Sequence, residues 1–121
     1  MLNVDKNNIV AVTRGDTFSI PIFLNKGTAI NPVRYVLGDN DTLYVGIMEP
    51  NQPFEQAIIK KKYTKDDLNT HEDIVLRLES SDTVCLIPGK YYYQVKLDMV
   101  DSEEKHNINT VIKKTEFFIV E

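Results

Sequence analysis

Hydrophobic and polar residues alternate with a period of two along most of this chain, and helical periodicity is nearly absent. Such alternation is typical of strands that bury one face, because successive side chains of a strand point to opposite sides of a sheet. Clusters of Gly, Pro, Asn, Asp and Ser interrupt it at fairly regular spacing. The pattern predicts strands over residues 9–13, 17–24, 42–49, 56–63, 73–79, 90–100 and 108–120.

The same alternation predicts which side chains enter the core. In the second predicted strand, Pro21 lacks an N–H group and therefore indicates an edge or a bulge. The inward set consists of aliphatic and aromatic residues at alternate positions: Phe18, Ile20, Ile22, Leu24, Leu43, Val45, Ile47, Ile74, Leu76, Leu78, Tyr91, Tyr93, Val95, Leu97 and Met99.

Seven or eight short strands without intervening helices favour a sandwich or a barrel over any α/β arrangement. We expect a single all-β domain over residues 1–121, an immunoglobulin-like antiparallel β-sandwich, because a Pro-Gly corner precedes the tyrosines at 91–93. Residues 28–41 are less regular, and we expect a long connection with one short strand. One helical turn is expected after Thr64, with Thr64 as N-cap and Asp67 at the third helical position.

Composition narrows the classes of function. The chain of 121 residues is long enough for one hydrophobic core, so no cofactor or disulfide is needed to explain its folding. A net charge of -4 argues against nucleic-acid binding, which depends on clustered Lys and Arg. The one dense basic run, 60–62, is expected to protect a strand edge. No apolar stretch is long enough for a membrane span, and the first residues lack the pattern of a signal peptide.

Residues that could carry chemistry are scattered in polar turns. Cys85 lies in the apolar run 84–87, so we expect a small buried hydrophobe and no nucleophile. His71 and His106 lack the spacing of metal ligands, and the turn 39–41 lacks the spacing of a calcium loop. The serines at 80–81 have no nucleophile context, and the acidic pairs at 66–67 and 103–104 are expected to be solvated. We therefore expect no enzyme, no metal and no cofactor.

Aromatic residues give the candidate interaction site. Three consecutive tyrosines at 91–93 must divide between the two faces of a sheet, so Tyr92 points outward when its neighbours point inward. Outward tyrosines suit interfaces. The candidate interaction residues are two outward tyrosines and an apolar turn: Tyr44, Tyr92, Pro50, Pro53 and Phe54.

Two segments carry a family resemblance. Residues 13–18 (TRGDTF) and 86–97 (LIPGKYYYQVKL) resemble the opening and penultimate strands of the immunoglobulin-like domain at the N-terminus of phage baseplate upper proteins. The resemblance implies a non-catalytic virion structural protein of the tail, baseplate, neck or capsid, assembled in the host cytoplasm. Its partners would be other virion proteins and copies of itself, with no nucleic acid or membrane.

Two other functions remain open at this point. A carbohydrate-binding module would use the outward tyrosines to stack on sugar rings. An enzyme would need a cluster of polar side chains that the sequence does not indicate.

Overall fold

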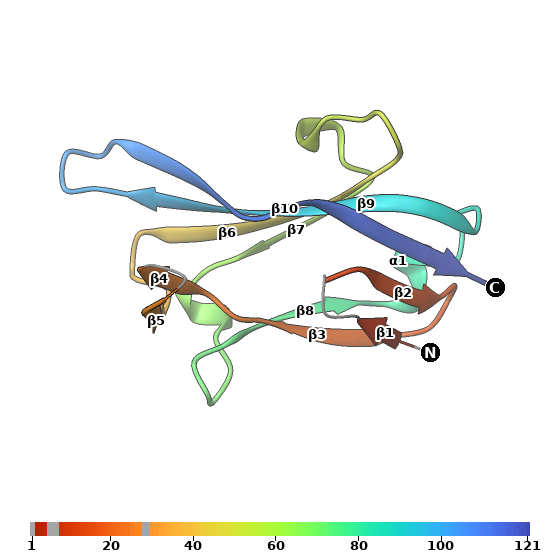
Figure 1. Cartoon of the computed structure of the whole chain (residues 1–121), viewed down its shortest axis with the longest axis horizontal. Coiled ribbons are helices and arrows are strands. Elements are labelled where there is room, and N and C mark those ends of the chain that lie inside the picture. The colour runs from red at the N-terminus through yellow and green to blue at the C-terminus, as the bar shows by residue number, and fades with distance from the viewer. Residues whose placement is uncertain (1, 5–7, 28–29) are drawn as a thin grey trace.

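The computed structural model describes residues 2–4, 8–27 and 30–121, which form two facing layers of strands (Figure 1). The larger layer is a six-stranded sheet in the order β1-β2-β10-β9-β6-β7. Its strands are β1 (Leu2–Val4), β2 (Val10–Thr13), β10 (His106–Val120), β9 (Gly89–Val100), β6 (Asp41–Met48) and β7 (Ile59–Tyr63). The facing layer contains β3 (Phe18–Ile22) and β8 (Ile74–Leu78), and β4 (Asn25–Gly27) pairs with β5 (Pro32–Arg34) in a small ribbon.

The chain changes layer at the turn between β2 and β3. Gly15 has a φ of 82°, a conformation that L residues with side chains rarely adopt, and the Gly15 N–H donates to Thr83 Oγ1 at 2.9 Å. The Arg14 N–H donates to the Val120 carbonyl at 2.7 Å. β2 pairs with β10 in parallel, and the other described strand pairs are antiparallel.

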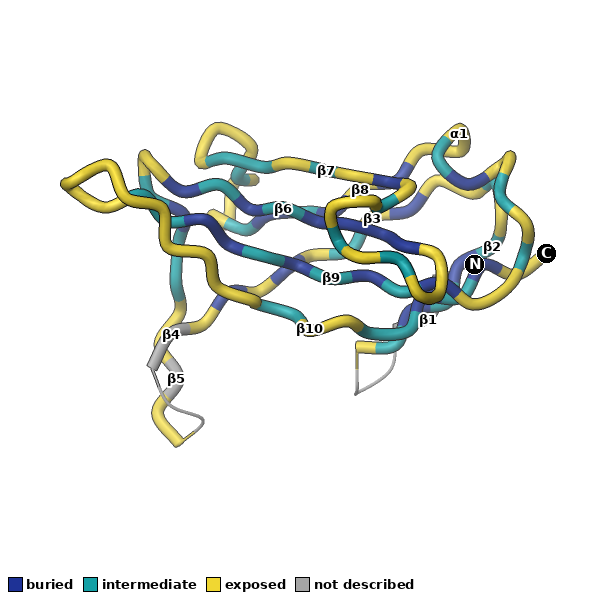
Figure 2. Tube along the Cα trace, turned by 90° about the horizontal axis from the view of Figure 1, so that it is seen from above, coloured by how far each residue is buried: buried dark blue, intermediate teal, exposed yellow. Residues whose placement is uncertain are grey.

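The core lies between the two layers and follows the predicted alternation. Phe117 is almost completely buried, and its ring lies 6.4 Å from that of Phe18 and 6.1 Å from that of Tyr93. Figure 2 shows buried residues running along β6 and β9 in the middle of the molecule. The expected inward residues belong to the core, with Ile20 and Met99 half-buried and the rest buried.

A tyrosine at the start of β9 provides an immunoglobulin-like landmark. The buried Tyr91 hydroxyl donates to the Ile87 carbonyl, four residues earlier, at 2.6 Å. A tyrosine that reaches back to the backbone where the chain enters this strand is the "tyrosine corner" of immunoglobulin-like sandwiches. Together with the strand order, it confirms the all-β sandwich fold.

Several local expectations need correction. The strand expected over 56–63 begins at Ile59, because residues Phe54–Gln56 form the short 3-10 helix η1. Residues Ser80–Thr83 form the helical turn α1. Residues Asn25–Gly27 form the strand β4, and residues 28 and 29 of the expected connection lie outside the described part of the chain. The helical turn η2 (Lys65–Asp67) is present, and the Thr64 N–H donates to Asp67 Oδ2 at 2.8 Å as a capping box requires.

The expectation that Cys85 is buried is wrong. Its side chain is exposed, as are those of Val84 (49%) and Ile87 (80%), because this apolar run forms the turn between α1 and β9. The fully buried residue of the turn is Thr83, whose hydroxyl accepts the Gly15 N–H described above. This connection therefore leaves Val84, Cys85 and Ile87 in solvent, while Leu86 packs against the core.

Candidate functional site

The outward tyrosines lie on one continuous surface, the outer face of the six-stranded sheet. We use "outer face" for the side of β6, β7, β9 and β10 that points away from β3 and β8. Tyr44 on β6 lies opposite Lys96 on β9, and Tyr92 on β9 lies opposite Met48 on β6. Both tyrosines are half-buried, so part of each ring remains available to a partner. The sequence prediction that Tyr92 and Tyr44 both point outward is consistent with this placement.

Phe54 also lies on the outer face, where sequence reasoning expected an exposed turn. Its ring packs over Gly46 of β6, so closely that a Cβ atom at Gly46 would be 2.7 Å from Phe54 Cε2. The Lys96 ammonium lies 4.8 Å from the centre of the same ring, a cation–π contact. Phe54 is half-buried as a result. Because Gly46 has no side chain, the Phe54 ring can pack directly against the strand at this position.

The segment that carries Phe54 is fastened to the sheet by lysines from two strands. Lys114 Nζ on β10 donates to the Gln52 carbonyl at 2.9 Å, and Lys60 Nζ on β7 donates to the Glu55 carbonyl at 2.6 Å. Inside the segment, the Glu49 N–H donates to Gln52 Oε1 at 2.9 Å. These contacts hold residues 49–57 against the outer face and leave the ring of Phe54 in a defined position.

The two prolines of the candidate site have different surroundings. Pro53 is exposed and precedes η1 as its N-cap residue. Pro50 is exposed and borders a shallow hollow of about 250 Å³ with Ile87, Lys90 and Tyr91. The structure therefore places Phe54, Tyr44 and Tyr92 on the same face, with Lys96 next to both Phe54 and Tyr44, whereas the prolines belong to the connecting segment.

Lysines surround these aromatic rings, which sequence reasoning did not anticipate. Lys114 Nζ and Lys90 Nζ lie over the Tyr92 ring at 5.4 and 6.0 Å from its centre. With Lys62, opposite Tyr44 on β7, five lysines share the outer face: Lys60, Lys62, Lys90, Lys96 and Lys114. The sequence did contain a signal, because 60 and 62 on β7 and 90 and 96 on β9 have the strand parity of outward residues.

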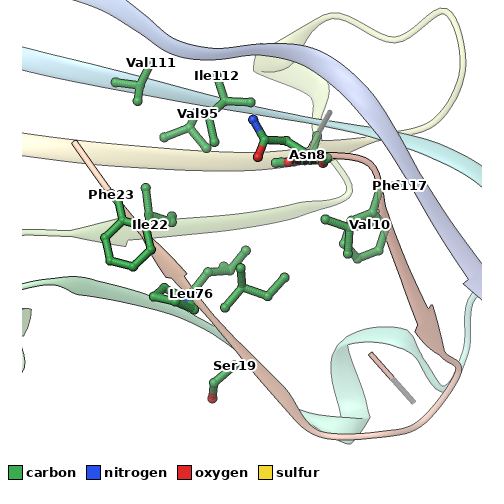
Figure 3. A pocket seen from close by; sticks show the side chains of 13 residues that line it. Asn8, Val10, Ser19, Ile22, Phe23, Leu76, Val95, Val111, Ile112 and Phe117 are labelled. Carbon is green, nitrogen blue, oxygen red and sulfur yellow. Dashed lines mark hydrogen bonds between the residues drawn. The ribbon is translucent and has the colours of Figure 1, made fainter. Parts of the chain in front are cut away.

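An apolar groove of about 450 Å³ lies between the two layers (Figure 3). Its lining includes Ile22, Phe23, Val95, Val111 and Phe117, and its polar side chains are limited to Asn8, Ser19 and Tyr93. Ser19 points away from the hollow in Figure 3, and the Tyr93 hydroxyl donates to the Asn8 carbonyl. None of the described residues that line the groove carries a carboxylate, imidazole, thiol or amine for acid–base chemistry.

Three titratable groups outside the groove, Tyr35, Asp41 and His106, have hydrogen-bond or ion-pair partners. The Tyr35 hydroxyl donates to Asp41, and burial followed by this contact raises the pKa of Tyr35 to about 12. Asp41 also accepts the Gly38 N–H at 2.8 Å, which makes 38–41 the expected tight turn. His106 Nδ1 lies 2.8 Å from Asp98 Oδ2, while His71 is exposed near β8. Among the residues with a described placement, no three His, Cys, Asp or Glu side chains gather as a metal site would require.

Comparison with known proteins gives no family. Neither the protein-family models nor the curated proteins contain a match to this chain. No helix in the described ranges is both long and apolar enough to cross a bilayer.

Proposed function

We propose that this chain is a non-catalytic docking domain of a phage virion, acting through protein–protein contacts in the tail, baseplate, neck or capsid. The virion setting is supported by the resemblance of residues 13–18 and 86–97 to the immunoglobulin-like domain of phage baseplate upper proteins. The docking role is supported by one structural observation, the placement of Phe54, Tyr44 and Tyr92 on the outer face, with Phe54 packed over Gly46. Other virion proteins and further copies of the chain are the proposed partners.

The physical argument is preorganisation. Ordering a side chain or loop on binding costs about 0.5–1.5 kcal/mol for each flexible side chain. Phe54 already has its seat over Gly46, and the Lys114 and Lys60 contacts already hold its segment. Partly exposed aromatic rings on a rigid sheet are typical anchors of protein interfaces. The outer face can therefore bind a partner with little further ordering.

The carbohydrate-binding alternative has less support from the same residues. A sugar ring stacks on an open aromatic face, but two ammonium groups lie over the Tyr92 ring. The lysines give this ring a cationic rim that suits a charged protein surface better than a neutral sugar.

Mass spectrometry of gradient-purified virions tests the proposal. We expect the protein at a fixed ratio to the major capsid protein, and we expect Tyr92→Ala with Phe54→Ala to be depleted from particles although it accumulates in the infected cell. Ser19→Ala is the matched control, because Ser19 is an exposed residue on the opposite layer. Absence of the wild-type protein from particles, despite abundance in the lysate, would refute the virion role.

A further inference from the structure

We infer that the outer face binds an acidic surface of a different protein, and that its five lysines select this partner by charge. This inference rests on the proposed docking function and adds the chemical class of the partner. It starts from the observation that the face is cationic in a chain whose net charge is -4.

The five lysines are available for such contacts. Lys60, Lys62, Lys90 and Lys114 are exposed and Lys96 is half-buried, and none of the five forms an ion pair with any residue that the structure describes. By contrast, Lys61, whose side chain alternates with those of Lys60 and Lys62, binds Asp82 at 3.1 Å. Acidic residues on the outer face are fewer than these lysines: Glu116 lies opposite Tyr92, Asp98 is buried beside His106, and the segment held against the face carries Glu49 and Glu55.

Edge protection does not explain this arrangement. Lysines on an exposed edge strand discourage pairing with another sheet, and this reason applies to Lys60 and Lys62 on the edge strand β7. Lys90 and Lys96 lie on β9, which pairs with β10 on one side and β6 on the other. The pairing with β6 ends at Tyr92, but Lys96 is flanked by Tyr44 of β6 and Thr110 of β10, so it has no free edge to protect and needs another explanation.

The cationic side chains of the outer face are lysines and not arginines, which favours a protein partner with carboxylates over a nucleic acid. Phosphate backbones are recognised preferentially by arginine, whose planar group binds two oxygens at once. All three arginines lie outside this group and are engaged with acids: Arg14 with Glu121, Arg34 with Asp73, and Arg77 with Glu79. Five of the 14 basic residues lie on the outer face, so the rest of the chain carries a net negative charge, which disfavours a long polyanion.

The aromatic rings among the lysines also favour a protein partner. Interfaces combine buried aromatic anchors at the centre with charges at the rim that steer the encounter. Tyr92 lies beneath Lys90 and Lys114, and Phe54 lies beside Lys96. An acidic partner surface would pair with the lysines while its apolar side chains cover the rings.

Binding of a short poly-L-glutamate peptide to the full chain provides the test. The face variant is Lys62→Gln with Lys90→Gln, because neither lysine fastens the Phe54 segment through a described hydrogen bond. The control is Lys65→Gln with Lys105→Gln, which removes the same charge from exposed residues elsewhere. We expect the face variant to bind roughly twofold to thirtyfold more weakly, from two exposed charge pairs worth about 0.2–1 kcal/mol each, and the control to bind as the wild type does. Raising the salt concentration should weaken wild-type binding more than binding of the face variant.

Three results would overturn the inference. The first is equal weakening of both variants, which would indicate a net-charge effect. The second is tighter binding of duplex DNA or phosphatidylserine vesicles than of poly-L-glutamate at equal charge concentration. The third is a salt-sensitive oligomer, seen by sedimentation velocity, that the face variant abolishes, since the partner would then be a second copy of the chain. The proposed function fails separately, through absence of the protein from virions, whatever the peptide measurements give.

Discussion

Replacing Gly46 by alanine should release Phe54 from the outer face. The new Cβ would lie 2.7 Å from Phe54 Cε2, 3.0 Å from Phe54 Cδ2 and 3.2 Å from Ala57 Cβ. These distances are below ordinary van der Waals contact, and cores and packed surfaces resist such overpacking. The Phe54 ring must therefore move, since Gly46 itself is fixed between β7 and β9.

The cost of this change can be estimated from the burial of the ring. Complete burial of a phenylalanine side chain contributes about 1.5–3 kcal/mol, so loss of the half-buried Phe54 contact should cost about 1 kcal/mol. The added methyl group restricts the unfolded chain and returns about 0.5 kcal/mol. The net loss of about 0.5 kcal/mol predicts a Tm lower by only about 2–3 °C. The main effect should be local, in the segment 49–57.

Hydrogen exchange of the amides in this segment is the assay. In the wild type, the Gln56 N–H donates to the Pro53 carbonyl at 3.0 Å and the Ala57 N–H donates to the Phe54 carbonyl at 3.1 Å. We expect these two amides to exchange about threefold to tenfold faster in Gly46→Ala, because local opening becomes easier by about 1 kcal/mol. Binding of poly-L-glutamate should weaken in parallel.

Gly38→Ala is the matched control for this substitution. Its Cβ would meet Asp41 Oδ2 at 3.4 Å, an ordinary contact, and neither Gly38 nor Gly46 has a left-handed φ. We expect Gly38→Ala to leave the exchange of the 49–57 segment unchanged. If the Gln56 and Ala57 amides exchange as slowly in Gly46→Ala as in the wild type, the close packing of Phe54 against Gly46 is refuted.

Three further predictions concern the sandwich itself. Tyr91→Phe removes the bond to the Ile87 carbonyl and should lower the free energy of unfolding by about 0.5–1.5 kcal/mol in urea titrations; an unchanged midpoint would contradict a stabilising corner. The pKa of Tyr35 is raised from 10.0 to about 12 by burial and by Asp41, so its contribution to stability is complete below pH 10 and is lost as the pH rises to 12. Between pH 10 and pH 12, the urea midpoint should therefore fall more steeply for the wild type than for Tyr35→Phe. Equal slopes for the two proteins would contradict the raised pKa of Tyr35. Exposed Cys85 should react with a thiol reagent in the folded protein, and a requirement for denaturant would show that it is buried.

The alternation of side chains along the sequence by itself determined much of this protein. It assigned Leu43, Val45 and Ile47 to the core and Tyr44 and Tyr92 to the opposite side, and the structure places them so. This succeeds because the period of a strand is two residues, so the side of each residue follows from local backbone geometry alone. The tyrosine corner was also visible as a Pro-Gly pair before Tyr91.

The tertiary structure alone decided which surfaces these residues share. Strand order brings Lys62, Lys96 and Lys114 from three strands onto one face, although they are far apart in the sequence. Local pattern also gave no sign that Phe54 would fold back onto Gly46, or that the apolar run around Cys85 would remain in solvent. Periodicity specifies the direction of a side chain relative to its own strand, whereas a binding surface depends on which distant strands and loops pack beside it.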